Sequence, residues 1–581
     1  MRRGQSEAGT GKKRPPLAGT CAAARLGVLA LAVSLTVPFA TSAQDPAASL
    51  AGALEAAIAE AQMPSDRSEM VATRAALRRL YDSAGMRPIW TAEGRPTAQT
   101  LRLAARLETL ADRGLRASDV GADSLARWTM RLDQWPAAGS AEITRFDVAA
   151  SVAAMRAIGD LHAGRIDPRS LGFQLPRVHA KADLAALALR VARAPDVHAA
   201  LAALEPPYPG YRALLPVLAR YRALASDPSL SVPRPHHSVL RPGDRYDDAP
   251  ALRSLLVALG DLPPDRRVGG DTVLEPPDPA AYDDALVEAV VAFQRRHGLA
   301  PDGVIGPATT AALRIPMSER VLQIELTLER WRWLPDAPPA AYVLVNLPAF
   351  RLDLFEPAVA GARPVLWMDV IVGEARHHHE TPVFLGTMRE VVFRPYWDVP
   401  LSIARKELIP MLRRDPGYLS REGMEIVRGG DFDAVIHPLT DANLDRVHAG
   451  SLRLRQRPGT RNALGPIKFV FPNAYNVYLH GTPATQLFER TRRDFSHGCI
   501  RVADPKSLAE QVLRSQPEWD RPAIDLATRD GEPTRRIRVT RAIDVYVFYA
   551  TAFAAEDGRA YFFPDIYGHD AKLAAVFGGE R

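Results

Sequence analysis

Cysteine is scarce in this chain of 581 residues, which contains only Cys21 and Cys499. If the segment that carries Cys21 is removed, Cys499 has no partner for an intramolecular disulfide. A lone thiol in an oxidising compartment indicates a reactive group, whereas a buried thiol behaves as an inert small hydrophobe. The count alone does not choose between these two interpretations.

Excess charge is also lacking once the N-terminus is set aside. The formal net charge is +6, but the basic residues of 1–43 account for nearly all of it, so the remaining chain is almost neutral. A nearly neutral protein has no general electrostatic reason to bind a polyanion. We therefore expect no nucleic-acid partner.

The sequence has no apolar run of the length that spans a bilayer, about 20 residues. A shorter run, Leu26–Ala40, follows a basic stretch and precedes the small residues Thr41-Ser42-Ala43. This order is typical of a secretory signal, so we expect residues 1–43 to be a signal peptide and the protein to be exported. The alternative is an uncleaved N-terminal anchor, which is then the only contact with a membrane.

Helical periodicity dominates the first half of the chain. Residues 46–235 repeat apolar positions at spacings of three and four, as in Leu103, Leu107 and Leu110, and they contain no catalytic constellation. We expect a helical scaffold domain there. We expect residues 240–314 to form a compact three-helix unit. The proline in Gly306-Pro307 marks the start of its third helix, because proline is favoured at the first helical position.

Strand patterns begin near residue 340. Residues 351–355 alternate with period two, and similar runs recur up to the C-terminus. We expect a strand-rich domain at 340–530, interrupted by a polar insertion at about 401–460 that lies over the sheet as a cap, and C-terminal strands at 531–581 that pack on it. The predicted fold class is therefore multidomain α+β.

The informative stretch runs from Asn476 to Val502. Alternation along a strand puts Tyr478 and His480 on one face, and Gly481 ends that strand. Cys499 follows after a loop that can fold back. Gly498 lets the backbone approach a substrate closely.

A thiol with a pKa of about 8.5 is mostly protonated at neutral pH. An imidazole that takes its proton makes a thiolate, which attacks a carbonyl carbon. His497 and His480 compete for this role, since one is near Cys499 in sequence and the other comes from a strand end. Backbone N–H groups of Gly498 and Cys499 are the natural donors for the developing oxyanion.

Two resemblances sharpen these expectations. Residues 292–309 resemble the small three-helix peptidoglycan-binding domain. His480-Gly481 followed by Ser496-His497-Gly498-Cys499-Ile500-Arg501 resembles the signature of the L,D-transpeptidase family. Pro395–Pro400 and Gln456–Gly465 resemble the large, cap-bearing branch of that family, which is found in Gram-negative envelopes.

The family resemblance implies roles for individual residues. Cys499 is then the nucleophile, and His480 is the general base, oriented by the backbone carbonyl of Gly481. The oxyanion site and the pocket are implied to consist of Ser496, His497, Gly498 and Arg501. Tyr478 and Trp397 are candidates for the substrate groove, although Trp397 equally suits a core position.

The resemblance also implies a fold, a reaction and a place. We expect a mostly-β, β-sandwich-like catalytic domain in the periplasm, without metal or cofactor, that carbapenems acylate. The partner is the stem peptide of peptidoglycan: the thiolate takes an acyl group from a tetrapeptide stem, releases D-Ala and passes the acyl group to a second stem, which forms a 3→3 cross-link. Alternatives are an L,D-carboxypeptidase, attachment of a lipoprotein to the wall through the same thioester, and a non-catalytic wall-binding protein.

Several other residues have plain interpretations. His377-His378-His379 are adjacent, so they rarely converge on one metal ion, and we expect a solvated loop. The arginines of 405–461 are interleaved with acidic residues, which favours a solvated cap surface. Arg453 and Arg455 are nevertheless candidates for contacts with stem-peptide carboxylates.

Overall fold

The computed structural model contains two units, residues 1–49 and 50–581. It describes residues 46–61, 67–131, 139–175, 182–230, 232–234, 239–263, 278–356, 363–376, 379–430, 433–555 and 557–578. The predicted signal segment 1–43, His377 and His378 lie outside these ranges. Within them, no helix combines the length and the apolar character needed to cross a membrane.

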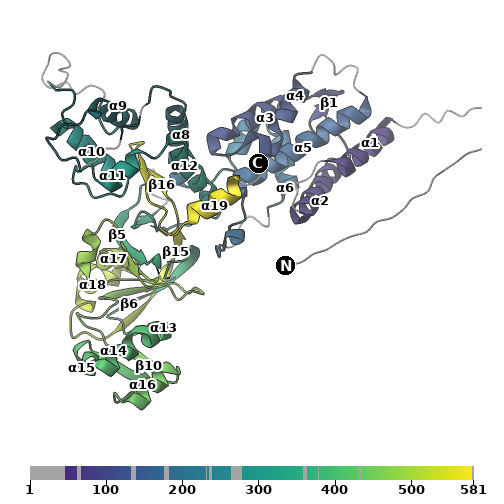
Figure 1. The fold of residues 1–581 in the computed structure, drawn as a ribbon. Helices are drawn as coiled ribbons and strands as arrows, with labels where there is room; N and C mark the ends of the chain where they lie inside the picture. Colours follow the sequence, from purple (N-terminus) through teal and green to yellow (C-terminus); the bar gives the residue numbers. More distant parts are fainter. Residues whose placement is uncertain are drawn as a thin grey trace, which may run out of the picture. The chain divides into compact units, whose positions relative to one another are not determined.

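Helices make up the described N-terminal region, as the sequence predicts (Figure 1). Leu103, Leu107 and Leu110 are fully buried, so the predicted stripe faces the core. A buried carboxylate, Asp147, accepts hydrogen bonds from the backbone N–H groups of residues 89–91 and fixes that turn. The helices are α1 (Pro46–Glu60), α2 (Arg67–Ser83), α3 (Ala98–Glu108), α4 (Ala122–Thr129), α5 (Ser140–Ala163), α6 (Leu184–Arg193) and α7 (Val197–Ala202), with the short strands β1 (Thr91–Ala92) and β2 (Arg95–Pro96).

The last helix of the predicted scaffold segment, α8 (Pro209–Ala225), belongs to a different core. Its buried aromatic residues Tyr211 and Tyr221 pack with the three-helix unit and with α12 (Met317–Trp331), not with α1–α7. Large aromatic rings bury extensive apolar area, so they decide which neighbour a helix takes. The unit consists of α9 (Ala249–Leu259), α10 (Asp284–Arg296) and α11 (Pro307–Leu313).

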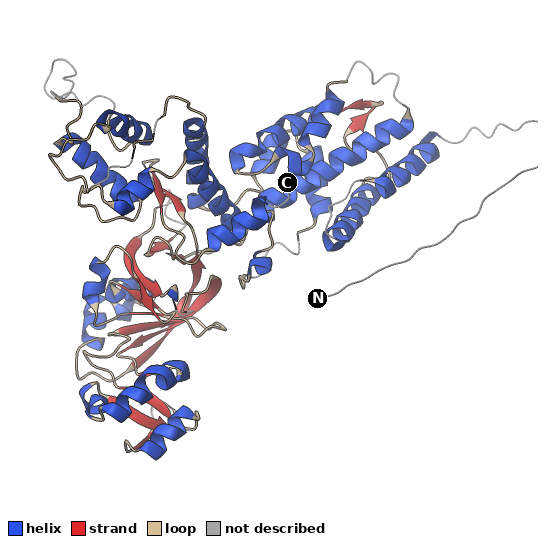
Figure 2. Cartoon of the chain, in the orientation of Figure 1, coloured by secondary structure: helices blue, strands red, loops and turns tan. Residues whose placement is uncertain are grey.

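The C-terminal half is built on one nine-stranded sheet in the order β13-β5-β14-β12-β11-β6-β15-β3-β4 (Figure 2). Because β4 also pairs with β5, the sheet closes on itself and its walls enclose one apolar core. This confirms the mostly-β prediction. The strands are β3 (Tyr342–Asn346), β4 (Arg351–Phe355), β5 (Leu366–Gly373), β6 (Phe384–Phe393), β11 (Ile467–Val470), β12 (Leu479–His480), β13 (Asp494–Ser496), β14 (Ile500–Val502) and β15 (Arg535–Phe548).

The C-terminal segment is more deeply integrated than the sequence predicts. We expected 531–581 to pack on the catalytic domain, whereas β15 lies inside its sheet, between β6 and β3. The first half of β15 is rich in arginine, so the hydrophobicity pattern of the sequence does not indicate a strand there. Outside the cap, the C-terminal half also contains the hairpin β16 (Ala552–Ala554) and β17 (Ala560–Phe562), and the helices α17 (Pro505–Val512), α18 (Arg521–Ala527) and α19 (His569–Gly578).

The cap has its own small sheet and core. We expected few strands in the insertion at about 401–460, but four strands pair in the order β7-β10-β8-β9, starting at Trp397. Leu412, Ile426 and Leu454 are among the buried residues of its core. The cap elements are β7 (Trp397–Asp398), β8 (Met424–Arg428), β9 (Val435–His437), β10 (Arg453–Gln456), α13 (Leu401–Ile403), the π-helical turn Ala404–Leu408, α14 (Ile409–Arg414), α15 (Gly417–Arg421) and α16 (Asp441–His448).

Candidate active site

The predicted catalytic residues lie on two adjacent strands of the closed sheet. β12 and β14 are parallel, and their register pairs Leu479 with Ile500 and His480 with Arg501. Leu479 and Ile500 are fully buried in the core. Because side chains alternate along a strand, Tyr478, His480, Cys499 and Arg501 occupy the opposite face.

This register makes Cys499 a diagonal neighbour of His480. One residue before the Leu479–Ile500 pair, Cys499 stands opposite Tyr478, and the N–H of Ile500 donates to the carbonyl of Tyr478 at 3.1 Å. The strand pairing therefore places on one face two residues that are 19 positions apart in the sequence.

The imidazole of His480 is buried and oriented. Its Nδ1 lies 2.5 Å from the carbonyl oxygen of Gly481. Since a carbonyl only accepts, Nδ1 carries the proton, and Nε2 is the unprotonated nitrogen of the neutral ring. The ring also forms a backbone hydrogen bond with Leu464. Burial, together with the positive charge of Arg501, lowers the pKa of His480 to about 3. The ring is therefore neutral at pH 7, as a general base must be.

Burial raises the pKa of the Cys499 thiol. Hydrogen bonds from the backbone and hydroxyl of Tyr478, and the positive charges of Lys468 and Arg501, act in the opposite direction. The thiol therefore needs a base to become a nucleophile at neutral pH. The ring of Tyr478 also lies 5.6 Å from that of His480, centroid to centroid, so Tyr478 contacts both predicted catalytic groups.

The backbone around Cys499 differs from the simplest expectation. The N–H of Gly498, a predicted oxyanion donor, instead donates to the hydroxyl of Ser496 at 3.1 Å. Ser496 in turn donates to the carbonyl of Cys499 at 2.5 Å. The described residues provide no partner for the N–H of Cys499, so this group is the available donor.

Two residues that the sequence did not single out hold this turn in place. The buried hydroxyl of Thr381 donates to the carbonyl of Gly498 at 2.9 Å and accepts the N–H of Gly373 at 2.8 Å. The hydroxyl of Tyr567 donates to the carbonyl of Gly373 at 2.6 Å. Gly498 has a φ of 111°, a conformation that strongly favours glycine. No local motif marks Thr381 or Tyr567, because both act from remote parts of the chain.

A pocket of about 260 Å³ opens onto Cys499 beneath the cap. Its wall includes Asn476, whose carbonyl oxygen lies 3.8 Å from the sulfur of Cys499. The cap contributes Lys406 and Glu407 from its π-helical turn. His480 is not part of the lining, so the pocket exposes Cys499 and not the imidazole.

The predicted pocket residue His497 connects this turn to the cap. Its Nε2 lies 2.8 Å from Oε1 of Glu407, and its ring lies 4.6 Å from that of His379. Trp397, which the sequence left open between groove and core, packs against the cap core and also hydrogen bonds to Tyr478. It does not line the pocket.

The two cap arginines proposed for stem carboxylates have structural partners instead. Arg453 pairs with Asp398 at 2.7 Å, and the buried Arg455 pairs with Glu425 at 2.8 Å. Arg455 also lies over the ring of Tyr396. Both guanidinium groups are therefore used within the cap.

The chain resembles known proteins along most of its described length. Residues 340–533 match the L,D-transpeptidase catalytic domain, residues 75–218 a scaffold domain, and residues 246–313 a peptidoglycan-binding domain. A curated Haemophilus influenzae protein that carries the name of an L,D-transpeptidase is 29% identical over 254 residues, which is 43% of this chain and 48% of that protein. The chain thus spans about half the length of this relative.

These matches agree with the geometry on the face of β12 and β14. The matched catalytic domain contains both His480 and Cys499, and the signature around them stands where the two strands meet. Residues 340–533 of the chain therefore form an L,D-transpeptidase catalytic domain.

Proposed function

We propose that this protein is a peptidoglycan L,D-transpeptidase that forms 3→3 cross-links between stem peptides. The observation that supports this most directly is the diagonal placement of a buried, neutral imidazole and a thiol on one face of parallel strands. The peptidoglycan-binding match at residues 246–313 supports the same polymer as substrate.

In the first half-reaction, Nε2 of His480 takes the proton of the Cys499 thiol. The sulfur then bonds to the carbonyl carbon of the diamino acid at position three of a donor stem. The N–H of Cys499 stabilises the oxyanion, a contribution that is worth about 3–4 kcal/mol in comparable sites. The C–N bond to terminal D-Ala breaks, and the His480 imidazolium returns its proton to the leaving amine.

In the second half-reaction, the side-chain amine of another stem enters through the pocket beneath the cap. It attacks the thioester carbon, loses a proton to His480, and forms the new amide as the C–S bond breaks. The sulfur takes the proton back from His480. Water in place of the amine gives a tripeptide stem, which is the L,D-carboxypeptidase outcome.

The place of this reaction follows from the substrate and the N-terminus. The basic, apolar and small-residue pattern of residues 1–43 supports export. We propose that the protein acts in the periplasm, where peptidoglycan lies in a Gram-negative envelope.

Product analysis tests the proposal. The full chain is incubated with a tetrapeptide-stem muropeptide, and the products and the intact protein are weighed by mass spectrometry. We expect a transient adduct on Cys499 that lacks D-Ala, followed by stem dimers. Tripeptide monomers without dimers contradict transpeptidation, and the absence of any adduct contradicts the thioester itself.

A further inference from the structure

A second pocket, of about 350 Å³, lies between the three-helix unit and the closed sheet. Arg295, Gly298 and Leu299 line it from the end of α10 and the turn that follows. The opposite wall is the loop 489–493, which leads from β12 to β13. The pocket does not include Cys499 or His480.

Buried contacts hold the end of α10 against β17, beside the pocket. Arg296, next to the pocket, donates to the carbonyl of Ala560 on β17 at 3.2 Å and is almost fully buried. The ring of His297 stacks on Phe562 at 5.7 Å. The wall that carries Arg295 is therefore fixed to a packed junction.

The lining is strongly basic. It contains four arginines and a single acidic residue, Glu489. Two of the arginines are engaged: Arg492 pairs with Asp494 at 2.6 Å, and Arg493 pairs with Asp369 at 2.7 Å. Arg493 also donates to the carbonyl of Val370, which fixes the loop to β5.

The other two arginines have no such partner. Arg295 and Arg490 are exposed, and neither forms an ion pair with any residue in the described ranges. A planar guanidinium matches a carboxylate through two parallel hydrogen bonds. Two guanidinium groups without ion-pair partners in the described ranges, on opposite walls of one pocket, therefore suit an anionic ligand.

We propose that this pocket binds a carboxylate of a peptidoglycan stem peptide, at a site separate from the catalytic pocket. The inference rests on the proposed function, which makes peptidoglycan the polymer at hand. The peptidoglycan-binding match at residues 246–313 includes Arg295, so the wall-binding domain itself contributes one guanidinium. The other comes from the segment between His480 and Cys499, so a bound stem contacts the chain that carries the nucleophile.

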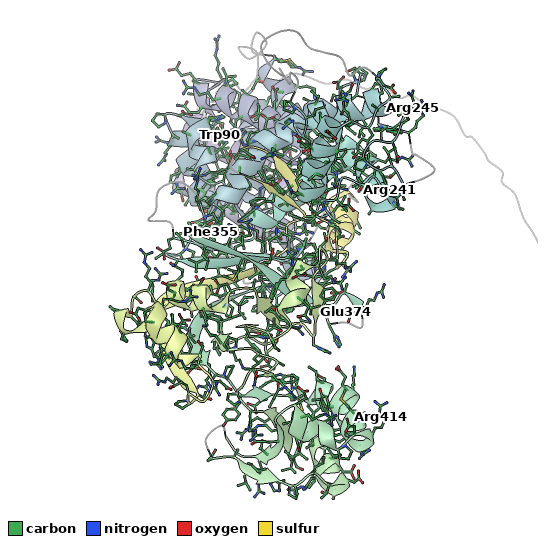
Figure 3. The ribbon with its side chains drawn as sticks, turned by 90° about the vertical axis from the view of Figure 1, so that its left-hand side faces the viewer. Trp90, Arg241, Arg245, Phe355, Glu374 and Arg414 are labelled. Carbon is green, nitrogen blue, oxygen red and sulfur yellow. The ribbon has the colours of Figure 1, made fainter. Side chains whose placement is uncertain are left out.

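Charge reversal tests the site in the full chain with Cys499→Ala, which removes turnover. Binding to purified sacculi is measured by sedimentation for the pair Arg295→Glu/Arg490→Glu. The matched control is Arg241→Glu/Arg414→Glu, which makes the same charge change at two exposed arginines outside this pocket, both labelled in Figure 3. We expect roughly tenfold weaker binding for the first pair only, because each guanidinium–carboxylate contact is a charge-assisted hydrogen bond.

Three ligands identify the source of the carboxylate. We expect the pocket variant to bind intact sacculi and free stem peptide more weakly than its control does. Glycan chains from which an amidase has removed the stems keep their lactyl carboxylates. If the pocket variant binds these chains as much more weakly than its control as it binds sacculi, the assignment to stem peptides is overturned. Equal binding by the pocket variant and its control overturns the site. If Arg295→Glu/Arg490→Glu lowers the melting temperature, Arg295→Gln/Arg490→Gln is used instead.

Failure of this second site can be distinguished from failure of the proposed function. Thioester formation is measured in the same arginine variants with Cys499 intact. Failure of wild-type protein to form a thioester contradicts the proposed function and leaves the sacculus measurement standing. Normal thioester formation with unchanged sacculus binding contradicts only the second site.

Discussion

The imidazole of His497 meets the carboxylate of Glu407, with 2.8 Å between Nε2 and Oε1. This contact joins the turn that carries Cys499 to the π-helical turn of the cap, across the mouth of the catalytic pocket. Both side chains are partly exposed, at 39% and 44%. The contact is therefore well placed to influence how the cap sits over a bound stem, but too exposed to determine stability.

We expect Glu407→Gln to raise KM for the donor stem while kcat stays nearly constant. The rise should be no more than about fivefold, because an exposed pair contributes roughly 0–1 kcal/mol. Steady-state kinetics with a soluble tetrapeptide donor measures both constants. Asp445→Asn, which removes the exposed Arg413–Asp445 pair elsewhere in the cap, is the matched control. A fall in kcat with unchanged KM contradicts a role in substrate binding.

We expect His480→Ala to slow acylation of Cys499 by about 10²–10⁴-fold at neutral pH, the usual worth of a general base. His497→Ala keeps the buried base and should lose less than tenfold. Intact-mass kinetics with a carbapenem, which we propose acylates the same sulfur, follows the rate directly. If His480→Ala is acylated at the normal rate and His497→Ala is acylated much more slowly, the general base is His497 instead.

The pH dependence of stability carries a signature of His480. Its pKa is about 3 in the folded protein, against about 6.5 in an unfolded chain. Below pH 6.5 the imidazole binds a proton in the unfolded state but not in the folded state. The contribution of His480 to the free energy of unfolding is therefore complete above pH 6.5 and decreases as the pH drops toward 3. The slope from one such group approaches about 1.4 kcal/mol per pH unit.

Chemical denaturation at pH 7 and at pH 5 measures this effect. Other buried histidines titrate in the same direction, among them His569, whose pKa is lowered to about 4 by burial. The informative quantity is therefore the difference between wild type and His480→Gln. We expect the variant to lose less stability between the two pH values, and an equal loss contradicts the buried, neutral state of His480.

Thr381 is predicted to act as a positioning residue for the nucleophile turn. Thr381→Val keeps the volume but removes the hydrogen bond to the carbonyl of Gly498 and the acceptor for Gly373. We expect about a tenfold lower rate of acylation and about 1–3 kcal/mol lower stability, the usual cost of unpaired buried groups. Thr381→Ser retains the hydroxyl and should restore the acylation rate. A rate that follows stability alone in both variants contradicts positioning.

The face that carries the chemistry could be predicted from alternation, since Tyr478 and His480 are two residues apart on one strand. The parallel pairing that sets Cys499 diagonally beside His480 could not, because strand register depends on long-range contacts. The roles of Thr381 and Tyr567 could not be predicted either, because their contacts with the turn of Cys499 are also long-range. In the cap, charged residues on the outer faces of short strands hid the small sheet, whose apolar residues are few and widely spaced.

Closure of the sheet also determines where it can open. Every strand in the closed circuit has partners on both sides, whereas β13 has β5 as its only partner among the described residues. Strands with one neighbour lose their hydrogen bonds first in local fluctuations. β13 directly precedes His497 and Cys499, so amide hydrogen exchange should be fastest just before the nucleophile. Local opening of this sheet therefore starts at the strand that adjoins the turn of Cys499.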